Sequence, residues 1–116
     1  MKIYQYPKCG TCKKALKWLD ERGVNYDSID ITAKPPTRAE LKKMLAHYGG
    51  EIRRLFNTSG QLYREFEIKN KLPSMSVADA IDLLSQHGKL IKRPFLLTND
   101  SGRVGFKEDE WIAALK

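Results

Sequence analysis

Two cysteines separated by two residues, Cys9 and Cys12, lie where the pattern of the chain changes from strand to helix. Residues 2–6 are rich in strand-forming side chains and end at Pro7, which has no backbone N–H to donate to a sheet. Between residues 12 and 23, apolar side chains recur at helical spacing, and the segment ends on a glycine. The cysteine motif is therefore predicted to form the loop that joins a first strand to a first helix.

This placement favours thiol–disulfide chemistry at the two cysteines. Two intervening residues let the sulfur atoms close a small ring on oxidation, and a helix N-terminus beneath them stabilises a thiolate. A Cys-x-x-Cys pair between a strand and a helix is typical of a thioredoxin-like redox site. Cys9 precedes the first helical turn and is flanked by Lys8, with Lys13 close by, so positive charge and free backbone N–H groups are expected to favour its ionised form. Cys9 is therefore predicted to be the exposed nucleophile, and Cys12 the resolving thiol. Gly10 and Thr11 are expected to let the backbone turn tightly beside the reactive sulfur.

Two other roles for the cysteines need to be weighed. An inert buried pair more often lies within an apolar run, whereas proline and lysine residues flank this motif. A zinc site would need His47 and His87 as further ligands, and their separation does not match the spacing of zinc-binding histidine pairs. We therefore expect a redox pair with no metal and no tightly bound cofactor.

Composition sets the size and the class of the protein. With 116 residues, 41% of them hydrophobic and 30% charged, the chain is expected to form one domain over residues 1–116 that needs no disulfide for stability. The formal charge of +7 is spread along the chain among acidic residues, which favours a solvated surface over direct DNA binding. No segment has the roughly 20 consecutive apolar residues of a membrane span, and the N-terminus has no signal-peptide core. A monomeric cytoplasmic protein is expected.

The rest of the chain predicts an α/β fold with helices inserted between two strand-containing halves. Residues 24–31 resume strand character, and the order strand, helix, strand favours a parallel pair. A helical block is predicted over approximately residues 37–88, beginning with the capping-box spacing of Thr37 and Glu40 and including two short helices between residues 51 and 72. Three further elements are predicted after it: a strand at 95–97, a strand at 103–106 and a helix from Glu108.

Arg93 and Pro94 form a second informative motif. A proline directly before a strand, after a long crossover from a Cys-x-x-Cys motif, is where thioredoxin-like folds place a cis-proline that faces the cysteines. If Pro94 faces Cys9, the Arg93 guanidinium would lie beside the sulfur, lower its pKa and bind an anionic substrate. The alternatives are an ordinary edge-strand proline and a solvated arginine.

Several segments of the chain together form a specific combination of motifs. They are residues 6–12, 35–37, 57–60 with Tyr63, 90–94 and 105–106. With these segments the chain resembles the arsenate reductase (ArsC) and Spx/MgsR family over nearly its whole length. The resemblance implies a thioredoxin-like core, formed by a mixed four-stranded sheet with flanking helices, and a helical insertion between its two halves. This arrangement agrees with the element order inferred from the residues.

The motif and the resemblance leave three functions open. A thiol–disulfide oxidoreductase would act through Cys9 and Cys12 on a protein or small-molecule disulfide, with glutathione, glutaredoxin or thioredoxin as reductant. A redox-sensing regulator similar to Spx would use the pair as a switch and bind the RNA polymerase α-subunit. An arsenate reductase coupled to glutathione and glutaredoxin would use Cys9 and three arginines, one of which matches Arg93. The other two positions fall on Asn57 and near Phe106. The basic residues nearby in sequence are Arg54, Arg64 and Lys107.

Overall fold

The computed structural model describes residues 1–115, which contain a four-stranded sheet. Strand β1 (Lys2–Gln5) lies between its parallel partner β2 (Asp27–Asp30) and its antiparallel partner β3 (Phe95–Leu97). Strand β4 (Gly102–Val104) pairs with β3 in antiparallel orientation at the edge. The predicted mixed four-stranded sheet is therefore confirmed, in the order β2-β1-β3-β4.

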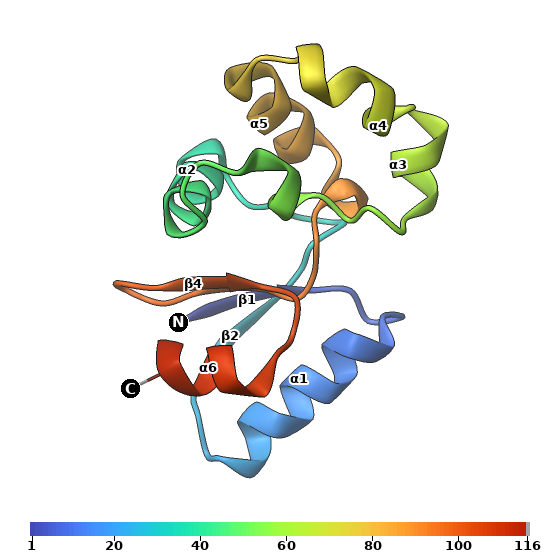
Figure 1. Cartoon of the computed structure of the whole chain (residues 1–116). Coiled ribbons are helices and arrows are strands. Elements are labelled where there is room, and N and C mark those ends of the chain that lie inside the picture. Colours follow the sequence, from blue (N-terminus) through green and yellow to red (C-terminus); the bar gives the residue numbers. More distant parts are fainter. Residues whose placement is uncertain (116) are drawn as a thin grey trace.

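Helices α1 (Gly10–Glu21) and α6 (Glu108–Ala114) cover one face of the sheet, the lower face in Figure 1. Alternate strand residues point to this face, and Ile3 and Leu96 are fully buried there. The buried helical residues of this cluster are Ala15, Trp18, Leu19 and Trp111.

The predicted helical insertion lies between β2 and β3, and it covers the opposite face of the sheet (Figure 1). Tyr4, Phe95 and Leu97 point toward the insertion and join a second, larger buried cluster. Among the helices of residues 1–115, none is long and apolar enough to cross a membrane. The elements of the insertion are α2 (Arg38–His47), η1 (Ile52–Leu55), α3 (Gln61–Glu65), α4 (Ile68–Lys71), η2 (Leu72–Ser74), α5 (Val77–Gln86) and η3 (Gly88–Leu90).

Side-chain caps define where the two longest helices of the insertion begin. Thr37 and Glu40 form the predicted capping box, in which the Thr37 hydroxyl accepts from the Glu40 N–H at 3.1 Å and the Glu40 carboxylate accepts from the Thr37 N–H at 3.0 Å. The Tyr4 hydroxyl donates to the same carboxylate at 2.7 Å, so the cap also ties α2 to β1. Ser76 caps α5 by accepting a hydrogen bond from the Asp79 N–H at 3.0 Å.

The boundaries of several elements differ from the sequence-based expectation. The strand expected over residues 24–31 pairs only within β2; of the residues before it, Val24 and Tyr26 lie outside the ladder and pack against the buried cluster beneath the sheet. The strand expected over residues 103–106 ends before Gly105, whose φ of 74° bends the backbone away. Four short helical segments replace the two helices expected over residues 51–72; the left-handed backbone of Glu67 separates the second segment from the third.

The chain returns from the insertion to the sheet through closely packed backbone. A Cβ atom at Gly88 would lie 1.8 Å from the Ile31 carbonyl oxygen, so a side chain cannot be accommodated there. Residues 55–57 and 90–92 then exchange two backbone hydrogen bonds, of 2.7 and 2.8 Å. These contacts fix the path of the chain directly before Arg93.

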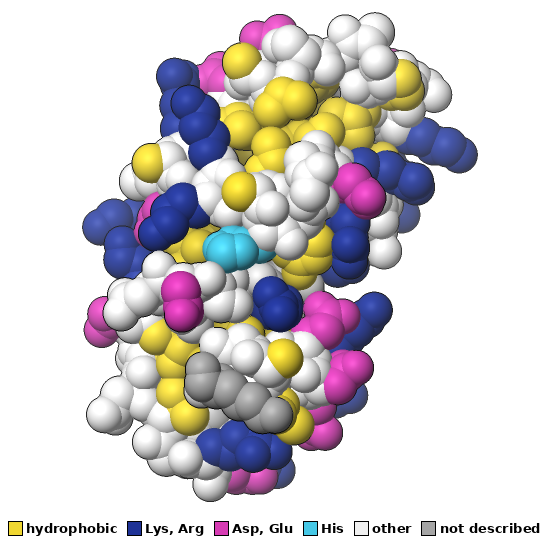
Figure 2. All heavy atoms as spheres, turned by 60° about the vertical axis from the view of Figure 1, so that its left-hand side comes forward, with side chains coloured by type: hydrophobic (Ala, Val, Ile, Leu, Met, Phe, Trp, Pro, Cys, Tyr) yellow, Lys and Arg dark blue, Asp and Glu magenta, His cyan; other side chains and the backbone are white. Residues whose placement is uncertain are grey.

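Charged side chains are dispersed over the surface. On the face drawn in Figure 2, lysines and arginines lie over both the insertion and the sheet half, with acidic side chains among them. The same view shows a group of hydrophobic side chains over the insertion. This distribution agrees with the solvated surface expected from the charge pattern.

Candidate functional site

Cys9 is the N-cap residue of α1, so its sulfur faces the free backbone N–H groups of the first helical turn. The Cys9 Sγ accepts a hydrogen bond from the Cys12 N–H at 3.4 Å. The Cys9 N–H donates to the Tyr6 carbonyl at 2.9 Å, which fixes the loop before the helix. The expectation that Cys9 precedes the first turn is confirmed, and its side chain is half-buried.

Cys12 lies within the first turn of α1 and is completely buried, with 0% of its surface exposed. Its Sγ accepts a hydrogen bond from the Tyr6 N–H at 3.5 Å. Both cysteines are free thiols. An incoming reagent can therefore reach Cys9, whereas Cys12 is shielded from solvent.

The two thiols differ in acidity. Partial burial opposes ionisation of Cys9, but the Cys12 N–H, the Cys12 thiol and the Arg93 guanidinium outweigh it and hold the pKa of Cys9 below its ordinary value. Burial is the largest effect on Cys12 and, together with the neighbouring Cys9, raises the pKa of Cys12 to about 12 despite the hydrogen bond from Tyr6. The site thus pairs a sulfur that ionises readily with one that keeps its proton.

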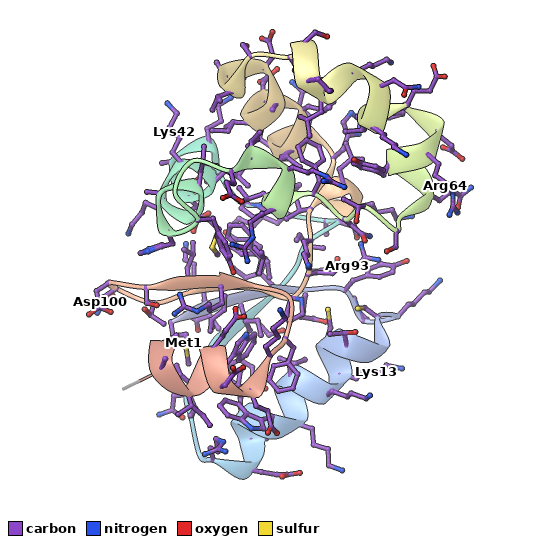
Figure 3. The ribbon with its side chains drawn as sticks, viewed as in Figure 1. Met1, Lys13, Lys42, Arg64, Arg93 and Asp100 are labelled. Carbon is purple, nitrogen blue, oxygen red and sulfur yellow. The ribbon has the colours of Figure 1, made fainter. Side chains whose placement is uncertain are left out.

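Pro94 lies directly before β3, as expected from the sequence, and the peptide bond between Arg93 and Pro94 is cis. The structure thus selects the cis-proline among the alternatives left open. Pro94 is buried and Arg93 is half-buried. The Arg93 Cζ lies 4.8 Å from the centroid of the Tyr6 ring, and its Nη1 donates a long hydrogen bond of 3.4 Å to the Lys89 carbonyl. Figure 3 shows Arg93 on the segment that descends from the insertion to the sheet. Arg93 is thus held at the site and is not a freely solvated arginine.

A pocket of 320 Å³ opens beside the Cys9 sulfur. Its walls come from the start of α1, the loop before α3, the segment before β3 and the turn after β4. Every charged residue that lines it is basic, so the pocket favours an anionic group. The lining residues are Cys9, Thr11, Asn57, Lys92, Arg93, Val104, Gly105, Phe106 and Lys107.

Two expectations about the motif need correction. The backbone of Gly10 lies outside the left-handed region, and a Cβ atom there would meet no atom within 4 Å beyond its two chain neighbours. The tight turn therefore does not depend on the backbone freedom of glycine, because Gly10 is already an ordinary first residue of α1. Lys8 is exposed and is not among the groups that lower the pKa of Cys9. Thr11, in contrast, lines the pocket as a site residue should.

Lys92 and Gly105 line the pocket, although neither was predicted as a site residue. A Cβ atom at Gly105 would lie 3.1 Å from the Lys92 Cε, so the glycine leaves room for the lysine side chain. Two sequence features could have indicated them as site residues: Lys92 is a second basic residue directly before Arg93, and Gly105 is a glycine at the end of a strand. Within residues 1–115, no three His, Cys, Asp or Glu side chains gather as a metal site would require.

A sequence model of the ArsC family matches residues 4–114. The chain belongs to the ArsC family. The solved structure of an ArsC family related protein from Bacteroides fragilis matches with a TM-score of 0.91 and 42% identity, covering 97% of this chain and 95% of that chain. YusI, an uncharacterized protein of Bacillus subtilis (strain 168), is 46% identical over 109 residues, 94% of this chain and 92% of YusI. The global transcriptional regulator Spx of Streptococcus mutans is 29% identical over 113 residues, 97% of this chain and 81% of Spx.

The two ArsC-family positions expected to correspond to further arginines both lie at the pocket. Asn57 and Phe106 line it together with Cys9 and Arg93, and Lys107 follows Phe106 on the same wall. The pocket of this ArsC-family chain therefore has a cation, Lys107, near one of those positions and a neutral amide at the other.

The other two basic residues considered at these positions lie elsewhere in the ArsC fold. The Arg54 Cζ lies 4.4 Å from the centroid of the Tyr48 ring, and Arg54 does not line the pocket. Arg64 projects from α3 at the outer edge of the insertion (Figure 3). Neither replaces a family arginine beside Cys9.

Proposed function

We propose that the chain is a thiol–disulfide oxidoreductase in which Cys9 attacks a disulfide and Cys12 resolves the intermediate. The observation that carries the proposal is the difference between the two thiols. Cys9 is accessible and has a lowered pKa, and the buried Cys12, whose N–H donates to the Cys9 sulfur, has a pKa raised to about 12. A nucleophile needs the thiolate form and access, and a resolving thiol needs only to be adjacent.

The reaction has two exchange steps. First, the Cys9 thiolate attacks one sulfur of the substrate disulfide, forming a mixed disulfide and releasing the other substrate sulfur as a thiolate, which takes a proton. The negative charge of Cys9 is then gone, which removes one of the effects that raise the pKa of Cys12. Second, Cys12 loses its proton and attacks the Cys9 sulfur, forming the Cys9–Cys12 disulfide and releasing the second substrate thiol. The substrate gains two electrons, and the cysteine pair loses them.

A thiol reductant completes the cycle by reducing the Cys9–Cys12 disulfide, and glutathione, glutaredoxin or thioredoxin has the required chemistry. The free thiols suit the cytoplasm, where thiols are kept reduced, so we place the activity there. The basic pocket favours a disulfide that carries a carboxylate near its sulfur atoms.

Trapping of the mixed disulfide tests the proposal. With oxidised glutathione as the probe, Cys12→Ser should accumulate an adduct at Cys9, which mass spectrometry detects as an added glutathionyl group. The double variant Cys9→Ser/Cys12→Ser is the control and should form none. If Cys12→Ser is alkylated at Cys9 but forms no adduct, the resolving role of Cys12 is wrong. Faster alkylation of Cys12 than of Cys9 in the unmodified protein would reverse the two roles.

A redox-switched regulator is the second candidate, and the likeness to Spx of Streptococcus mutans supports it. In this function, formation of the Cys9–Cys12 disulfide would change the surface that binds the RNA polymerase α-subunit. Pull-down with purified α-subunit, under oxidising and reducing conditions, tests it. Binding in one redox state supports the regulator, and no binding in either state excludes it.

Arsenate reduction is the third candidate, and the basic pocket beside Cys9 supports it because an oxyanion would meet Lys92, Arg93 and Lys107 there. Production of arsenite in an assay coupled to glutathione and glutaredoxin would establish this activity. Arg93→Gln is the matched variant and should lower the rate if arsenate binds in this pocket. Absence of arsenite with the unmodified protein would exclude this function.

A further inference from the structure

Tyr6 makes separate contacts through its backbone and its side chain. Its backbone holds the cysteine loop, because the carbonyl accepts from the Cys9 N–H at 2.9 Å and the N–H donates to the Cys12 sulfur at 3.5 Å. Its ring faces Arg93, whose Cζ lies 4.8 Å from the ring centroid. A substitution of the side chain therefore alters the contact with Arg93 and leaves the backbone contacts available.

Few other contacts hold the Arg93 guanidinium in place. Within residues 1–115, Arg93 forms no ion pair with a carboxylate. Its hydrogen bond to the Lys89 carbonyl is long, at 3.4 Å, and its Nε is shielded from solvent without a hydrogen-bond partner. Apart from its interaction with the Cys9 sulfur, the guanidinium has the Tyr6 ring as an aromatic surface beside it.

We propose that Tyr6 is a positioning residue whose ring holds the Arg93 guanidinium at the pocket, beside the Cys9 sulfur. A cation over the face of an aromatic ring is attracted by the ring quadrupole, and this contact leaves its charge unneutralised. A carboxylate in the same place would hold the arginine equally well but would cancel its charge. Aromatic support therefore keeps the full positive charge available to the Cys9 thiolate or to an anionic substrate.

The inference rests on the proposed function, because it concerns the nucleophile of that reaction. The charged and titratable groups around Cys9 are the buried Cys12 thiol and the basic residues of the pocket wall. The Lys89 Nζ also lies near the Tyr6 ring, 5.9 Å from its centroid. Substitution of Arg93 itself is needed to separate its effect on the pKa of Cys9 from the effect of the nearby lysines. The basic residues to be kept constant are Lys89, Lys92 and Lys107.

The rate of Cys9 alkylation by iodoacetamide as a function of pH measures this contribution. Tyr6→Phe keeps the ring and should titrate as the unmodified protein does. Tyr6→Leu removes the ring and should raise the pKa of Cys9, lowering the thiolate fraction at neutral pH by about threefold. Arg93→Gln should raise the pKa at least as much. An unchanged pKa in Tyr6→Leu would overturn the proposal.

The double variant Tyr6→Leu/Arg93→Gln separates positioning from general packing. If the ring acts only through Arg93, the double variant titrates as Arg93→Gln alone does. A further increase in the pKa of Cys9 would mean that Tyr6 acts by another route, and would contradict the proposal.

A measurement on the unmodified protein covers the case in which Tyr6→Leu does not fold. The side-chain proton signals of Arg93 should show an upfield ring-current shift in the NMR spectrum, and ordinary arginine shifts would overturn the proposal. Failure of the proposed oxidoreductase function would give a different result from failure of the positioning role. If only the oxidoreductase function is wrong, the pKa of Cys9 still responds to substitution of Tyr6 and Arg93, but Cys12→Ser traps no mixed disulfide.

Discussion

Cys9 and Cys12 carry the same functional group only three positions apart, and their surroundings give them opposite acidities. Cys9 caps a helix beside a guanidinium, whereas Cys12 is enclosed by the protein. Ionisation of Cys12 is disfavoured mainly by the loss of water around the charge. Because burial raises the pKa of Cys12 only in the folded state, ionisation of this thiol is linked to the free energy of unfolding.

The stability of the fold should therefore decrease at alkaline pH through Cys12. The folded protein keeps the Cys12 proton until a pKa of about 12, whereas an unfolded cysteine loses its proton near pH ~8.5. Above that pH the unfolded state binds fewer protons, so the free energy of unfolding falls as pH rises, by up to about 1.4 kcal/mol per pH unit. Urea unfolding of Cys9→Ser should show this loss, and Cys9→Ser/Cys12→Ala should show less of it. Equal slopes for the two variants would contradict the raised pKa.

The sequence identified the residues whose spacing carries information. Cys9 and Cys12 were found from their separation, and Arg93 with Pro94 from their place before a strand. Lys92 and Gly105 were missed because a single lysine and a single glycine have no diagnostic spacing, and their contact joins two distant segments. Lys8 is adjacent to Cys9 in sequence but is not among the groups that lower the pKa of Cys9, because its side chain is exposed to water, which screens its charge.

Helix α1 begins with the reactive residue as its cap, so one side chain serves both the chemistry and the helix. The sulfur of Cys9 accepts the N–H of the third helical residue, as the oxygen of a serine cap would. The predicted capping box at the start of α2 shows the same principle with ordinary cap residues. The short helices between residues 51 and 72 were harder to predict, because segments of one turn depend on tertiary packing for their stability.

Substitutions at Cys9 should therefore separate catalysis from helix stability. Cys9→Ser keeps a strong N-cap and should unfold in urea close to the unmodified protein. Cys9→Ala removes the cap and should be less stable than Cys9→Ser by about 1 kcal/mol. Both variants should lose thiol activity completely. Equal stability of the two variants would show that the cap contributes nothing measurable to the fold.

The sheet separates two buried clusters, and the chain must cross from the insertion side back to β3 to complete the site. Gly88 lies at this crossing, against the carbonyl of Ile31 at the end of β2. The order of elements could be predicted from sequence, because strand and helix patterns alternate in a recognisable order. The close approach of Gly88 could not be predicted, because it depends on the relative position of the insertion and the sheet.

A side chain at the crossing should destabilise the whole fold. Gly88→Ala would force the Ile31 backbone to move and should lower the free energy of unfolding by about 3 kcal/mol or more. Gly10→Ala is the control: its Cβ meets no atom within 4 Å, and its stability should be unchanged or increased by about 0.5–1 kcal/mol. Urea unfolding of the two variants provides the comparison. A Gly88→Ala protein as stable as Gly10→Ala would contradict the packing described at the crossing.

The position of both tryptophans on one side of the sheet determines what their fluorescence can report. Both tryptophans of the chain, Trp18 and Trp111, lie between the sheet and helices α1 and α6, with ring centroids 6.1 Å apart. Intrinsic fluorescence therefore reports on that side of the sheet, whereas the far-ultraviolet circular dichroism signal arises from helices on both sides. Loosening of the insertion alone would change the dichroism and leave the emission almost constant. Phe106 contacts both indole rings and lines the thiol pocket, so the same emission can follow events at Cys9 without an added label.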